Sequence, residues 1–229
     1  MRWKAFFAAP FSFARCIIVG SIADFLQLLA AIAGTATAFN PYAGHSRGSL
    51  VRRRNLSLYF HRMLERRPRL LLLGEAPGYR GCRVTGVPFT SEAILLADDS
   101  PFGLFGAAAG FAVGESQMWR HEASATAVWQ TLVELDVLPL LWNAFPYHPH
   151  QPARPDSNRP PTIRELDQGR IVVLDLLELF SIERVIAVGN KPAVALARWG
   201  IAAPKVRHPA HGGRTAFRRE LRSLVAPGA

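Results

Sequence analysis

Cysteine is scarce in this sequence, which has only Cys16 and Cys82 among its 229 residues. Two thiols cannot form a disulfide framework, and they cannot supply the four thiolates of an ordinary iron–sulfur cluster or of a four-cysteine zinc site. We therefore expect a protein without disulfide staples, an iron–sulfur cluster or any other bound cofactor. Lysine is also scarce, because it stands only at positions 4, 191 and 205, so arginine supplies nearly all of the positive charge.

Long hydrophobic runs are absent as well. Near the N-terminus, an apolar stretch at residues 16–20 and a small-residue site at residues 36–38 resemble a secretory signal weakly. Arg15, Asp24 and Gln27 interrupt the apolar residues, so no segment reaches the roughly 18 to 20 residues that a membrane span needs. We expect no transmembrane helix, no membrane partner and a cytoplasmic location.

Two familiar kinds of binding motif are missing. The segment Gly74-Glu75-Ala76-Pro77-Gly78 lacks the Gly-Lys-Ser/Thr of a Walker A loop, and no Gly-x-Gly-x-x-Gly follows a predicted strand. His148 and His150 are close in sequence, but no cluster of carboxylates or cysteines joins them, and Pro149 between them favours a surface loop. The sequence therefore predicts neither a nucleotide cofactor nor a metal site.

The chain has enough apolar residues to form a core, because 49% of it is hydrophobic and 19% is charged. We expect one domain at residues 22–229, preceded by an extension at residues 1–21. Lys and Arg number 27 against 17 for Asp and Glu, which gives a formal charge of +10. Such a charge is typical of proteins that bind a polyanion such as nucleic acid, although codon bias in an arginine-rich chain is an alternative cause.

Short apolar runs alternate with amphipathic segments along the chain. Buried strands are predicted at residues 69–73, 137–142, 184–188 and 204–207. Helical spacing of apolar residues predicts helices at residues 22–32, 52–67, 122–135, 162–180 and 192–200. This alternation predicts an α/β fold, a three-layer α/β/α arrangement with a central, mostly parallel four-stranded sheet.

Ligands of such sheets bind at the carboxyl ends of the strands, where three loops rich in glycine, proline and polar residues are expected to converge. These loops are residues 74–78, 143–146 and 208–213. Asn143 offers the donor and acceptor needed to read an amide-like edge such as that of uracil, or else it forms a turn. His208 donates to an oxygen that gains negative charge, or is a structural histidine. Phe89 stacks on a flat base, or packs in the core.

Taken in order, five segments between about residues 70 and 224 resemble motifs of the uracil-DNA glycosylase superfamily. Residues 74–78 are similar to motif A of the thermophile-type branch, and Thr85-Gly86-Val87-Pro88-Phe89 resembles the segment that carries a uracil-stacking phenylalanine. Residues 140–143 resemble the strand that ends in a uracil-reading asparagine. Residues 157–166 resemble the stretch leading into the next helix, and His208-Pro209-Ala210 resembles the His-Pro-Ser of motif B.

Some positions depart from the superfamily's patterns. The Gln-Asp-Pro-Tyr type uses its aspartate to position water and its tyrosine to exclude the methyl group of thymine, whereas Ala76 and Gly78 stand here. Glu75 is the nearest carboxylate, so we expect it to orient the water, with a backbone carbonyl as the alternative. The thermophile-type cysteines are missing, and residues 79–92 contain no histidine of the uracil-crosslinking branch. These departures favour a separate branch.

The resemblance implies a monomeric, monofunctional DNA-repair hydrolase that flips deoxyuridine out of DNA and cleaves its N-glycosidic bond. Glu75 and His208 are the implied catalytic residues. The implied uracil-binding residues are Gly74, Glu75, Ala76, Phe89 and Asn143. The implied DNA-binding residues, which include a wedge at residues 207–214, are Thr90, Ser91, Arg207, Pro209, His211, Gly212, Gly213 and Arg214. Two alternatives stay open: a non-catalytic protein that binds uracil-containing DNA, and a general module for RNA or another polyanion.

Overall fold

The computed structural model describes residues 20–114 and 121–226. The predicted extension at residues 1–21 lies outside these residues except for Gly20 and Ser21, and so does Cys16. Ser21 is the N-cap of the first helix, and its hydroxyl accepts a hydrogen bond from the backbone N–H of Asp24. Among the described residues, no helix has both the length and the apolar character needed to cross a membrane.

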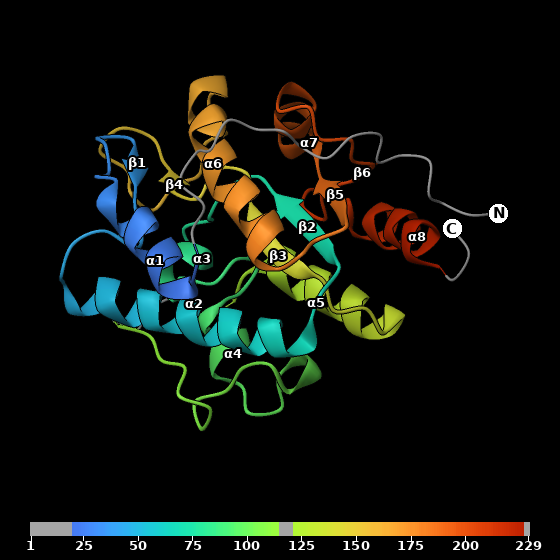
Figure 1. Ribbon diagram of the computed structural model, residues 1–229, viewed down its shortest axis with the longest axis horizontal. Helices are drawn as coiled ribbons and strands as arrows, with labels where there is room; N and C mark the ends of the chain where they lie inside the picture. Colours follow the sequence, from blue (N-terminus) through green and yellow to red (C-terminus); the bar gives the residue numbers. More distant parts are fainter. Residues whose placement is uncertain (1–19, 115–120, 227–229) are drawn as a thin grey trace.

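The fold is built on a parallel sheet of four strands in the order β3-β2-β5-β6. The predicted α/β/α class is confirmed, and each strand lies within a few residues of its predicted place (Figure 1). The strands are β2 (Leu70–Gly74), β3 (Leu140–Asn143), β5 (Arg184–Val188) and β6 (Lys205–Val206). Because β2 lies in the middle, the residues at its carboxyl end have neighbours on both sides.

Helices cover both faces of this sheet. Helices α6 and α7 pack together over one face, and α5 and α8 pack together over the other (Figure 1). The longer helices are α1 (Ile22–Ala31), α2 (Arg47–Arg66), α5 (Ala123–Leu135), α6 (Ile163–Leu179), α7 (Asn190–Arg198) and α8 (Arg214–Val225). The short helical segments are α3 (Cys82–Thr85), α4 (Glu92–Leu96) and η1 (Pro101–Gly103).

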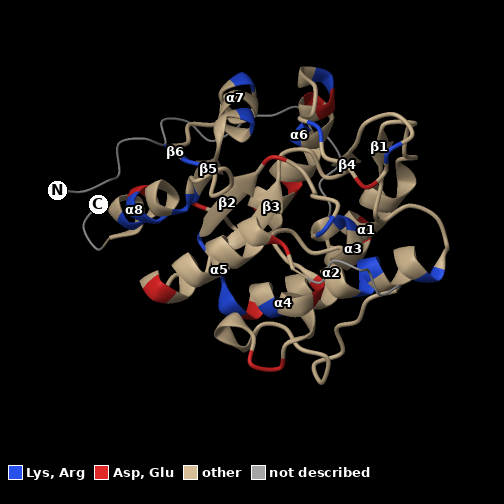
Figure 2. Cartoon of the chain, turned by 180° about the vertical axis from the view of Figure 1, so that it is seen from behind, with Lys and Arg blue, Asp and Glu red and all other residues tan. Residues whose placement is uncertain are grey.

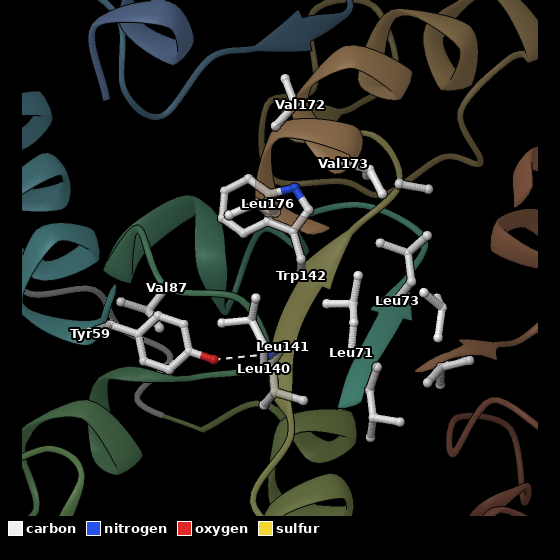
Figure 3. Packing of buried hydrophobic residues seen from close by; sticks show 14 of the residues in the cluster. Tyr59, Leu71, Leu73, Val87, Leu140, Leu141, Trp142, Val172, Val173 and Leu176 are labelled. Atoms are coloured by element: carbon white, nitrogen blue, oxygen red, sulfur yellow. Dashed lines mark hydrogen bonds between the residues drawn. The ribbon is translucent and has the colours of Figure 1, made fainter. Parts of the chain in front are cut away.

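Strand β3 is one of the two edge strands of the sheet, and buried side chains cover it. Trp142 lies beneath α6, where it packs with Val172 and Leu176 (Figure 3). The hydroxyl of Tyr59 on α2 accepts a hydrogen bond of 2.9 Å from the backbone N–H of Leu141. This bond occupies a donor at the open edge of the sheet, so α2 closes that edge and holds the strand that ends in the candidate site.

Local capping signals fix several helix ends. Thr162 caps α6, and Glu165 completes the predicted capping box by accepting from the Thr162 backbone N–H at 2.8 Å. Helix α2 begins at Arg47, earlier than the predicted residue 52, because Ser46 caps it. Helix α8 was not predicted, although its apolar residues Phe217 and Leu221 are fully buried.

One prediction about a loop is wrong. His148 and His150 are buried at 0% and 8% exposure, where a surface loop was expected. The reason is a second, two-stranded antiparallel sheet, in which β4 (His148–Pro149) pairs with β1 (Ala38–Phe39). This pairing between distant segments removes the histidines from solvent. It could not be predicted from the residues near them in the sequence.

Candidate active site

The carboxyl ends of the four parallel strands meet at one edge of the sheet, where the loops after β2, β3 and β6 border a cavity of about 510 Å³. The structure brings all three predicted loops together around this cavity. These loops supply Glu75, Ala76, Pro77, Gly78, Asn143, His208, Ala210 and His211, and Arg207 stands just before the third loop. Other segments supply Gly81, Cys82, Phe89, Thr90, Glu122, Ser124, Pro149, Asn158, Arg159 and Pro160.

Gly74, Phe89 and Asn143 meet at the end of β2 and β3. Gly74 and Asn143 are direct neighbours in the strand register. A Cβ atom on Gly74 would lie 2.4 Å from Cζ of Phe89 and 2.7 Å from Oδ1 of Asn143. Real Cβ atoms do not approach neighbours so closely, so this ring and this amide can come together only over a glycine.

Asn143 is a buried residue with 5% exposure. Within residues 20–114 and 121–226, its amide forms no hydrogen bond with another group of the protein. The polar atoms of this amide are not fully buried, because Asn143 lines the cavity, so water or a ligand there can supply their hydrogen-bond partners. The amide therefore stands ready to pair with a ligand that offers both a donor and an acceptor.

Phe89 is held in an unusual backbone conformation. Its φ of +53° lies in the left-handed region, which a bulky side chain rarely adopts. The indole N–H of Trp129 on α5 donates to the Phe89 carbonyl at 2.8 Å, and Thr90 donates through its hydroxyl to Val87 at 2.7 Å. These bonds fix the strained turn and hold the ring against Gly74.

The Gly74–Gly78 loop continues the ladder between β2 and β3. The carbonyls of Gly74 and Glu75 accept from the backbone N–H groups of Ala144 and Phe145 at 2.8 and 3.0 Å. In the described part of the chain, the N–H groups of Glu75, Ala76 and Gly78 donate to no protein acceptor. The loop thus uses its carbonyls for the fold and leaves donors for a ligand.

Glu75 is the carboxylate that this loop brings to the cavity. It is half-buried, and burial raises its pKa while the nearby positive charge of Lys191 lowers it. Lys191 lies in the first turn of α7, just after β5, and β5 pairs with β2. The segment after β5 therefore adds a positive charge to this edge. This charge was not predicted from the sequence, because Lys191 stands next to the start of a predicted helix, outside the three predicted loops.

His208 follows β6 and is half-buried in the cavity wall. Its Nδ1 atom accepts a hydrogen bond of 3.1 Å from the backbone N–H of Ala210. Burial lowers its pKa, the charge of Arg207 and the ring of His211 lower it further, and Glu122 opposes them. A neutral ring whose Nδ1 accepts must carry its proton on Nε2, so His208 is a hydrogen-bond donor through Nε2.

Gly189 makes room for this histidine. Its φ of +98° is closed to most other residues, and a Cβ there would lie 3.3 Å from the Cβ of His208. Glycine at the end of β5 thus lets the motif B segment pack directly against the neighbouring strand end.

Glu122 is a cavity residue that the sequence reasoning missed. It is the N-cap of α5, and its carboxylate accepts from the backbone N–H groups of Ser124 and Ala125 at 3.0 and 2.5 Å. Its charge favours the protonated form of His208. A capping glutamate looks purely structural in sequence, so only the packing of α5 against this edge shows its place in the wall.

Five of the predicted DNA-binding residues fall into three groups. Arg207 and His211 are exposed and line the mouth of the cavity, and His211 has a positive φ of +51°. Thr90 and Ser91 are buried and bond within the protein. Arg214 opens helix α8 and donates to the side chain of Gln130 on α5, away from the cavity lining. Figure 2 shows further basic residues along α8 and α2.

Metal ligands do not gather in the described residues, since no group of three or more His, Cys, Asp or Glu side chains comes together there. Cys82 lines the cavity as a free thiol, and burial raises its pKa to about 12, so it is no thiolate at neutral pH. Besides hydrogen-bond donors, the cavity therefore offers the amides of Asn143 and Asn158, the Phe89 ring and the carboxylates of Glu75 and Glu122.

No protein-family model matches this sequence, and a search of curated proteins finds no match either. Its fold, however, matches a solved structure, that of wild-type SMUG2 from Pedobacter heparinus, a member of the uracil-DNA glycosylase superfamily. The TM-score is 0.59 at 14% sequence identity, and the match covers 90% of this chain and 97% of that chain. The fold expected from the sequence motifs is thereby confirmed.

Proposed function

We propose that this protein is a monofunctional uracil-DNA glycosylase, which flips deoxyuridine out of DNA and hydrolyses its N-glycosidic bond. The observation that carries the proposal is the Asn143 amide, which lines the cavity, has no hydrogen-bond partner in the described protein and lies beside Gly74 and the Phe89 ring. An amide next to a flat aromatic face suits a planar base with a donor and an acceptor on one edge.

Recognition of the base follows from this arrangement. The Phe89 ring stacks on the flipped uracil, and the Asn143 amide pairs with its O4 and N3–H. The free N–H groups of Glu75 and Ala76 donate to O2. The protein already holds these donors and the ring in place before the base arrives. Binding therefore costs little conformational entropy in the site.

Departure of the base is helped by His208. Cleavage of the glycosidic bond leaves negative charge on uracil, chiefly at its oxygens, and the Nε2–H of a neutral His208 donates to that charge at O2. The pKa of His208 is lowered by burial, which favours the neutral donor. Lys205 donates to Asn190 at 3.0 Å and does not line the cavity, which supports hydrolysis without a lyase step.

Water is oriented by Glu75 in this proposal. Ala76 has no side chain to do so, and Glu75 is the carboxylate of the same loop. The positive charge of Lys191 counteracts the effect of burial and favours the ionised form that can accept a proton from water. The positive charge at the mouth, where Arg207 stands, favours binding of the DNA backbone.

The test is strand cleavage at a single uracil. Purified protein is incubated with a labelled oligonucleotide containing one uracil, beside a thymine control, and alkali then cuts any abasic site. Scission at uracil alone is the expected result. Uracil-specific binding without scission would instead identify a non-catalytic binder, and equal affinity for both oligonucleotides would refute base recognition.

A further inference from the structure

His148 lies behind the cavity wall, next to the wall residue Pro149. It stands on β4 opposite Phe39 and has no solvent exposure. Its ring stacks on that of His150, with centroids 5.7 Å apart and the planes inclined by 24°. The proposed reaction uses neither ring, yet a histidine buried this completely needs partners for both of its nitrogens.

Two backbone carbonyls flank the ring. Nδ1 lies 2.7 Å from the carbonyl oxygen of Pro77, and Nε2 lies 3.1 Å from that of Pro155. Carbonyl oxygens only accept, so a ring N–H must donate in each bond that forms. The shorter distance marks the bond from Nδ1–H to Pro77 as the stronger of the two.

Pro77 belongs to the loop that carries Glu75. The fold secures the start of this loop, because the carbonyls of Gly74 and Glu75 accept from the segment after β3. Within the described residues, the next loop carbonyl that accepts a hydrogen bond is that of Pro77. His148 therefore fixes the loop on the far side of Glu75 and Ala76.

Pro155 precedes a second segment of the cavity wall, which contains Asn158, Arg159 and Pro160. Asn158 of this segment lines the cavity and accepts from the Tyr79 backbone N–H at 3.1 Å. The imidazole thus touches one wall segment and a residue just before the other, so its position couples their spacing.

We propose that His148 is a positioning residue, whose Nδ1–H bond to the Pro77 carbonyl sets the placement of the Glu75 carboxylate and of the loop's free N–H groups. This inference rests on the proposed function. Misplacement of catalytic groups by about 1 Å typically lowers a rate about 100-fold, so loss of this bond is expected to slow uracil release strongly.

Two amide variants separate the two sides of the ring. His148→Asn keeps a donor near the position of Nδ1, whereas His148→Gln puts its donor near the position of Nε2. We expect single-turnover uracil release within about threefold of wild type for H148N and about 10- to 100-fold slower for H148Q. Equal rates in the two variants would overturn the proposal, and so would failure of both variants to fold.

Hydrogen exchange gives a second readout that needs no enzymatic activity. The backbone N–H groups of Gly81 and Arg83 donate to the Gly78 carbonyl, and that of Tyr79 donates to Asn158, so these amides report on the loop. We expect faster exchange at residues 79–83 in H148Q than in H148N. A wild-type protein that releases no uracil would refute the proposed function alone, while equal exchange in the two variants would refute the role of His148.

Discussion

Replacement of Gly74 by alanine adds one methyl group at the point where the Phe89 ring and the Asn143 amide meet. The backbone of Gly74 does not have a positive φ, so alanine is permitted there and the added atom is the whole perturbation. Its Cβ would lie 2.4 Å from Cζ of Phe89 and 2.7 Å from Oδ1 of Asn143. Both groups must move for the methyl to fit.

The size of the effect follows from these distances. Carbon atoms in contact are normally about 3.5–4.0 Å apart, so the ring must retreat by about 1 Å or more. Two features of Phe89 restrict this movement, namely its backbone φ of +53° and the hydrogen bond that its carbonyl accepts from the indole N–H of Trp129. A shift of about 1 Å in a reacting group costs roughly 100-fold in rate, which is about 2.7 kcal/mol of activation free energy. Overpacking should also lower the free energy of unfolding by about 1–3 kcal/mol.

The assay is single-turnover release of uracil by Gly74→Ala, with Gly78→Ala as the matched control. Gly78 is in the same loop, but a Cβ there would meet no atom within 4 Å. We expect the control to stay within about threefold of wild type while Gly74→Ala falls about 100-fold. Thermal denaturation first checks that both variants are folded. Equal rates for two folded variants would refute the placement of the base between Phe89 and Asn143.

Three further predictions concern other parts of the protein. His208→Ala should lower the single-turnover rate by about 100- to 1,000-fold, because it removes the Nε2–H donor; a change below about threefold would exclude this role. Arg214→Ala should reduce the slope of log affinity for DNA against log salt by about 0.9, the share of one phosphate, and an unchanged slope would leave Arg214 bonded only to Gln130. Burial, assisted by Glu178, raises the pKa of Asp175 to about 6, above its value of about 3.9 in an unfolded chain. The folded state therefore disfavours the ionised form, so stability falls as pH rises from about 4 to 6, and Asp175→Asn should stabilise the protein at pH 7 by about 1–3 kcal/mol. Thermal denaturation of both proteins across this pH range checks the sign, and equal melting temperatures at pH 7 would contradict it.

Much of the fold could be predicted because its signals are local. The run of leucines in β2 predicts a strand buried on both faces, and Thr162 with Glu165 predicts the start of α6 through a capping box that the structure contains. Helix α8 was missed because only two of its residues, Phe217 and Leu221, are fully buried, and its arginines dominate the pattern.

The sequence by itself determined the order of strands and helices, the loops that end the strands, and the residue types that each loop offers, because turns, caps and hydrophobic periodicity act over a few residues. Only the tertiary structure decided which groups meet. The contact between Gly74 and Phe89 depends on the docking of a loop held by Trp129, and the donor on Nε2 of His208 depends on the bond from Ala210. The burial of His148 depends on pairing between segments more than 100 residues apart, which no local signal encodes.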